Sequence, residues 1–135
     1  MSQEPEEPAR RKKGVYVGAP ACFALELACE QLNRAFAGRN RFCCYLVGSA
    51  LQRPDWRDVD VRLIMHDEDF AELFPDAGDH WEQDPRWLIM TVAISRHLSE
   101  ATGLPIDFQF QPQTHANKRH NGPRNPMGLR IAKSG

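Results

Sequence analysis

Two aspartates one residue apart, Asp58 and Asp60, are the side chains whose spacing most clearly suggests chemistry. They stand in the run Asp58-Val59-Asp60-Val61. Side chains alternate between the faces of a strand, so both carboxylates would point to one side. Like charges held this close raise one another's pKa unless a cation lies between them. Carboxylate oxygens suit Mg²⁺ or Mn²⁺, and Mg²⁺ commonly joins carboxylates to substrate phosphates, so the pattern predicts a divalent-metal site.

A glycine-serine pair precedes these acids. Gly48 and Ser49 end an apolar run, and a spacer of eight residues separates them from the first acid. Glycine permits close approach of a phosphate, and the serine hydroxyl can donate hydrogen bonds to phosphate oxygens. By itself such a pair is usually only a turn, and the acids that follow favour a phosphate site. Within the spacer, Arg53 and Arg57 are candidates to contact a triphosphate, and either one could equally pair with Asp55 at the surface.

A third acid lies further along the chain. Asp107 stands on the polar side of an alternating stretch in which Ile106, Phe108 and Phe110 form the apolar side. The alternation predicts a strand with one face toward the core. Asp107 is therefore either the third member of a carboxylate cluster or an incidental acid on a half-exposed edge strand, and the acids upstream favour the cluster.

Together, Gly48-Ser49, the spacer, Asp58-Val59-Asp60-Val61 and the later Asp107 resemble the nucleotidyltransferase signature of the DNA polymerase beta superfamily. The resemblance covers roughly residues 42 to 110. It implies a minimal nucleotidyltransferase sheet whose active site lies on its open, polar side.

The resemblance also implies an activity. A nucleoside monophosphate would pass from a nucleoside triphosphate such as ATP to a hydroxyl, with release of pyrophosphate. Asp58, Asp60 and Asp107 would hold Mg²⁺ or Mn²⁺, and Gly48 with Ser49 would hold the phosphates. The acceptor would be tRNA or another RNA, a protein or a small molecule, and a partner subunit could supply the site for it.

Two other classes of function stay open. The spacer is shorter than the family's usual range and the chain has no room for a second domain, which suits a catalytically inactive binding or assembly module of the same fold. Basic residues at 10–13 and 118–133 suit a small nucleic-acid-binding protein, because phosphate neutralisation dominates such binding.

The elements that must position these acids follow from periodicity. Helical spacing of apolar residues predicts helices over 21–37 and 84–101, the second beginning at Asp84-Pro85. Apolar or alternating runs predict strands over 42–47, 58–65 and 105–110. Gly38 and Gly103 are placed to end the two helices. The fold class is α/β, or α+β in stricter schemes: a small mixed sheet with helices packed on one face.

Charge and composition predict three parts. Residues 1–13 lack core-forming side chains and are expected to be a disordered arm. Residues 14–112 are expected to be the nucleotidyltransferase-like domain. Residues 113–135 hold five basic and no acidic residues, with Gly and Pro recurring, and are expected to be a flexible tail.

The location predicted for the protein is the cytoplasm. The chain of 135 residues is 41% hydrophobic, which suits one domain with a single core. No apolar run approaches the roughly 20 residues needed to cross a bilayer, and the first residues do not resemble a secretory signal. The four cysteines show no Cys-x-x-Cys pair and are expected to be reduced thiols.

Overall fold

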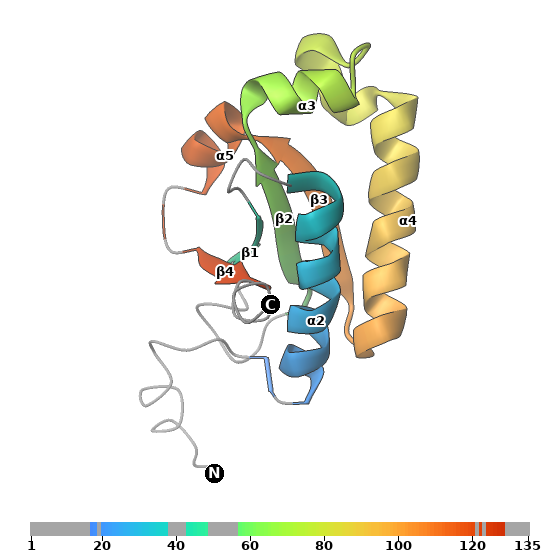
Figure 1. Ribbon diagram of the computed structural model, residues 1–135, viewed down its shortest axis with the longest axis vertical. Coiled ribbons are helices and arrows are strands. Elements are labelled where there is room, and N and C mark those ends of the chain that lie inside the picture. Colours follow the sequence, from blue (N-terminus) through green and yellow to red (C-terminus); the bar gives the residue numbers. More distant parts are fainter. Residues whose placement is uncertain are drawn as a thin grey trace.

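The computed structural model describes residues 17–18, 20–37, 43–48, 57–120, 122 and 124–128. Within them the chain forms a four-stranded mixed sheet with helices (Figure 1), so the predicted α/β class is confirmed. The elements follow in the order α2 (Ala21–Leu32), η1 (Asn33–Ala37, a π-helical turn), β1 (Cys44–Val47), β2 (Val59–Met65), α3 (Asp67–Leu73), η4 (Gly78–Gln83, a 3-10 helix), α4 (Pro85–Thr102), β3 (Ile106–Pro112), α5 (Gln113–Arg119) and β4 (Asn125–Met127).

The sheet has the strand order β3-β2-β1-β4. β1 is antiparallel to both of its neighbours, whereas β2 and β3 are parallel. A parallel pair needs a long crossover connection, and α3, η4 and α4 provide it. This crossover brings Asp107 of β3 beside the strand that carries Asp60.

One face of the sheet packs against α2 and α4, which lie side by side in Figure 1. Alternate residues of β2 and β3 are buried beneath these helices: Val59, Val61, Leu63, Ile106, Phe108 and Phe110. The inner side of α4 is also fixed to β3 by hydrogen bonds, since Ser95 Oγ donates to the carbonyl of Phe108 (3.2 Å) and Trp87 Nε1 donates to that of Phe110 (3.0 Å).

Local sequence accounts for the ends of α4. The Asp84 carboxylate accepts a hydrogen bond from the Trp87 amide (3.0 Å), and Pro85 occupies the first helical position, as predicted. Gly103 ends the helix at φ 75°, a left-handed conformation that suits glycine. Gly38, the predicted end of the first helix, lies outside the described residues.

The folded domain does not end near residue 112, so that prediction is wrong. Residues 113–119 form α5, and β4 adds a fourth strand to the sheet beside β1. Met127 is fully buried, and its carbonyl accepts a hydrogen bond from Asn33 Nδ2 (2.9 Å). Residues 113–128 have too few apolar side chains for their composition to predict burial. Backbone pairing of β4 with β1 stabilises this part of the chain instead. Residues 1–13 and 129–135 lie outside the described part.

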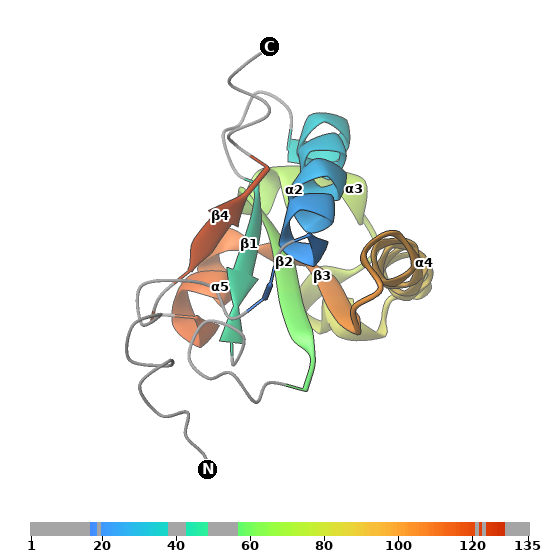
Figure 2. The ribbon, with the colours of Figure 1, turned by 90° about the horizontal axis from the view of Figure 1, so that it is seen from below.

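α5 packs against β2 and β3 on the side of the sheet away from α2 (Figure 2). Ile64 points to this side and is 1% exposed, and Ala116 of α5 is fully buried. The helix therefore covers the sheet near the carboxyl ends of β2 and β3 and leaves the opposite ends of these strands uncovered by it.

Candidate active site

Asp60 and Asp107 occupy neighbouring positions on the two parallel strands. Strand register pairs Asp60 with Asp107 on one side and with Val47 of β1 on the other. Register partners point to the same side of a sheet, so both carboxylates lie on the face opposite α2 and α4. We call this side the carboxylate face, defined by Asp60, Arg62 and Asp107. The two acids keep partial access to solvent, with side chains 27% and 48% exposed.

Arg62 connects the two acids. It follows Asp60 by two residues on β2, which places it on the carboxylate face, and it is only 8% exposed. Its Nη2 lies 3.5 Å from Asp107 Oδ2 and 3.9 Å from Asp60 Oδ1, while Nη1 donates to the backbone carbonyl of Asp107 (2.7 Å). Its Nε is buried without a hydrogen-bond partner among the described residues. The guanidinium thereby fixes the β3 backbone beneath one acid and offsets the repulsion between both.

The pKa of Asp60 is raised from its ordinary value. Burial is the largest cause, and the charges of Asp107 and Asp58 act in the same direction, whereas Arg62 opposes them. A carboxylate that is half desolvated beside two other acids gains from a further cation. This electrostatic environment suits a metal ligand.

Gly48 lies against Asp60. Its φ is +81°, a conformation that non-glycine residues rarely adopt, and a Cβ atom at this position would lie 2.4 Å from Asp60 Oδ2. Only glycine fits here without movement of the acid. The predicted turn after β1 therefore begins beside the carboxylate, where the sequence pattern placed it.

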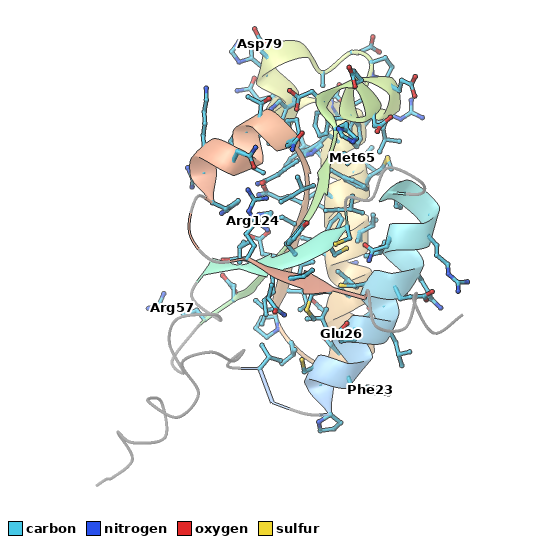
Figure 3. The ribbon with its side chains drawn as sticks, turned by 60° about the vertical axis from the view of Figure 1, so that its left-hand side comes forward. Phe23, Glu26, Arg57, Met65, Asp79 and Arg124 are labelled. Atoms are coloured by element: carbon cyan, nitrogen blue, oxygen red, sulfur yellow. The ribbon has the colours of Figure 1, made fainter. Side chains whose placement is uncertain are left out.

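The remaining predicted residues are only partly described. Asp58 lies in a bend directly before β2 and is exposed. Its negative charge contributes to the raised pKa of Asp60. Arg57, two residues before β2, is also exposed (Figure 3), and it forms no ion pair with a described residue. Ser49 and Arg53 lie outside the described residues.

The structure adds side chains that the sequence did not single out. His120, at the end of α5, lies near Arg62, and burial followed by the Arg62 charge lowers the pKa of His120 to about 4. Its Nε2 is buried without a hydrogen-bond partner in the described part of the chain. The Arg124 guanidinium lies over the ring of Tyr45, with its Cζ 5.6 Å from the ring centroid. Tyr45 is the register partner of Arg62 on β1. The two-residue period from Asp60 could have indicated Arg62, but no local signal indicates His120 or Arg124.

The donor set suits a hard divalent cation in the type of its atoms. Asp60 and Asp107 supply carboxylate oxygens from adjacent positions, and Asp58 is near enough to affect Asp60. No group of three or more His, Cys, Asp or Glu side chains is arranged to hold an ion within the described residues. A bound cation would thus be held first by Asp60 and Asp107, with Asp58 reaching it from the exposed bend.

No family model, curated protein or solved structure matches the chain. No helix among the described residues combines the length and the hydropathy that a membrane crossing needs.

Proposed function

We propose that this chain is a metal-dependent nucleotidyltransferase, which transfers a nucleoside monophosphate from a nucleoside triphosphate to a hydroxyl and releases pyrophosphate. The observation that carries the proposal is the placement of Asp60 and Asp107 side by side on one face, with the glycine turn at Gly48 against Asp60. Phosphoryl transfer demands mainly positioning and charge neutralisation, and an open face with paired acids beside a turn suits both demands.

The acids and the glycine of the site have distinct roles in this proposal. Bound Mg²⁺ or Mn²⁺ would neutralise phosphate charge and activate the acceptor hydroxyl. Asp58, Asp60 and Asp107 would hold the ions. Asp107 is the more exposed of the paired acids and so the better placed to receive the acceptor's proton. Gly48 lets the turn after β1 lie directly against Asp60, because it has no side chain.

Arg62 positions the acids. The hydrogen bond from Nη1 to the Asp107 carbonyl holds β3 in register at the site, and the positive charge on Nη2 offsets the repulsion between the two carboxylates. Arg124, one strand further along the same face, adds positive charge for a triphosphate.

A second candidate is a catalytically inactive member of the same fold. The observation that favours it is again Arg62, since a guanidinium that already contacts both acids can serve as their permanent counter-ion. In that case the face would bind a partner or a nucleotide without transferring a nucleotidyl group.

Metal-dependent binding and transfer, measured together, separate these candidates. Calorimetry with Mn²⁺ and non-hydrolysable analogues of the four nucleoside triphosphates should show binding that needs the metal. Transfer of label from α-labelled triphosphates to RNA, to the protein itself or to small hydroxyl compounds should accompany it. Binding without transfer would favour the inactive module, and absence of metal-dependent binding by the wild-type chain would overturn the proposal.

Asp60→Asn and Asp107→Asn should each lower transfer at least about 100-fold, because each removes a ligand charge that the proposed site needs. Glu100→Gln is the matched control, since this exposed acid lies on α4, on the other side of the sheet. Far-ultraviolet circular dichroism should stay unchanged, as the raised pKa of Asp60 shows that burial does not favour its charged form. Near-normal activity in Asp60→Asn would contradict the assigned role.

A further inference from the structure

The outward side of α4 carries large apolar side chains that are exposed and do not pack into the core. The large hydrophobic residues that are exposed in the described part of the chain are Phe23, Leu27, Leu88, Ile89 and Val92. Three of them lie on α4, and Ile89 and Val92 are 69% and 60% exposed. Single exposed apolar residues are ordinary, but Leu88, Ile89 and Val92 lie together within two helical turns and line one open groove.

We propose that α4 packs antiparallel against α4 of a second copy of this chain, about a two-fold axis near Ala93. The buried side of α4, which includes Trp87 and Leu98, already faces the core. The opposite side carries Ile89, Val92 and Ala93, which line an open groove together with Leu88 and Arg96. A small residue at the crossing point allows close approach of the two helices.

Charge complementarity argues for a second copy and for this orientation. Arg86 and Glu100 lie seven residues before and after Ala93, and both are exposed. Neither takes part in an ion pair with a described residue. A rise of about 1.5 Å per residue puts each of them about 10 Å along the helix from the axis, in opposite directions. An antiparallel two-fold therefore brings Arg86 of one copy to Glu100 of the other, twice by symmetry. A parallel pair would instead bring like charges together.

The shape of the surface fits the same arrangement. Ile89 lies four residues before Ala93, so it meets the turn of the second copy that carries His97. That turn borders a groove of about 260 Å³ between α2 and α4, lined by Ala24, Leu27, Ala28, Gln31, His97 and Ala101. The most exposed apolar side chain of one copy thus reaches a groove on the other (Figure 1 shows α2 beside α4). Leu27 of this groove is itself an exposed apolar residue that the contact would cover.

This association is independent of the proposed function. α4 covers the face of the sheet opposite Asp60 and Asp107, so a dimer through α4 leaves both carboxylate faces open. Variants that separate the copies should keep whatever activity the wild-type chain shows.

Charge-reversal variants of the full chain test the proposal by sedimentation velocity across a concentration series. The wild type should be a dimer that dissociates on dilution. Arg86→Glu and Glu100→Arg should each weaken dimerisation at least about tenfold, because each creates two like-charge contacts. An equal mixture of the two variants should form heterodimers more tightly than either forms homodimers, since both contacts in the mixed pair join opposite charges. Glu72→Arg on α3 is the control and should not change the dimer.

Ile89→Glu should yield a monomer with an unchanged circular dichroism spectrum, as this side chain is outside the core. A wild type that is monomeric at every concentration would overturn the proposal and leave the α4 surface to a different partner. A dimer that Ile89→Glu leaves intact, or a mixture of the charge variants that forms no heterodimers, would also overturn it.

Discussion

Asp60 is the residue on which both the site and its local packing depend. Gly48 occupies the space beside one carboxylate oxygen, and Arg62 lies near the other. Gly48, Asp60 and Arg62 therefore pack together, and a substitution at any one of them should shift the positions of the other two.

Gly48→Ala should destabilise the protein and reduce transfer, for two reasons. Alanine is strained at a φ of +81°, and its Cβ would clash with Asp60 Oδ2. Strain of this kind costs about 1 to 3 kcal/mol in the free energy of unfolding. Urea denaturation measures the loss.

Gly103→Ala is the matched control for that variant. Gly103 has a similar φ of +75°, but a Cβ there would have nothing within 4 Å. Gly103→Ala should lower the free energy of unfolding by less than Gly48→Ala does, since it introduces backbone strain without a clash. Equal losses for the two glycines would show that the contact with Asp60 contributes nothing.

At the scale of elements, α5 is docked by a contact that sequence patterns do not reveal. Asp67, in the first turn of α3, accepts hydrogen bonds from the amide (3.1 Å) and the hydroxyl of Thr114 in the first turn of α5. The Thr114 hydroxyl is the largest cause of the lowered pKa of Asp67. Since α5 ends at His120 near Arg62, this contact helps to position one border of the candidate active site.

Thr114→Val should lower the free energy of unfolding at neutral pH by about 0.5 to 1 kcal/mol, a small value because Asp67 is exposed. The folded-state pKa of Asp67 lies below its unfolded value, so the stability it contributes is present above the unfolded pKa and is lost as pH falls through the folded one. The difference between variant and wild type should therefore shrink in acid.

Urea denaturation at several pH values measures this difference, and Asp67→Asn provides the comparison. The double variant should lose little more than either single variant, because both changes remove the same interaction. A difference that stayed constant down to acid pH would mean that the ionised Asp67 plays no part in docking α5.

At the scale of the whole molecule, the carboxyl-terminal segment completes the sheet. β4 pairs with β1, and Gly128 packs against α2, where its amide donates to Glu26 Oε1. Asn33 of η1 joins β4 to β1, since it donates to the Met127 carbonyl and accepts a hydrogen bond from the Cys44 amide (2.8 Å). Residues nearly 100 positions apart in sequence thus hold β1, the strand that leads into Gly48.

A chain that ends after residue 121 should lose more than about 3 kcal/mol in the free energy of unfolding, because it loses the fully buried Met127 and exposes the edge of β1. A chain that ends after Gly128 keeps β4 and is the control. Urea denaturation and light scattering report stability and aggregation. Equal midpoints for both truncated chains would show that β4 contributes little.

Much of the fold could be predicted because local patterns determine it. Alternation predicted the faces of β2 and β3, helical spacing predicted α2 and α4, and Asp84-Pro85 with Gly103 predicted the limits of α4. The spacing of Asp58 and Asp60 also indicated the candidate site, since side-chain direction on a strand depends only on the backbone.

Only the tertiary structure decided the rest, because it depends on contacts between distant residues. The sequence placed Asp107 on a strand, but a register shift of one residue would turn it to the other face, and packing of β3 against α4 selects the register that pairs it with Asp60. The contacts of Arg62 also depend on tertiary structure, because the two acids that it contacts lie on different strands. β4 is a strand only because it can pair with the edge of β1.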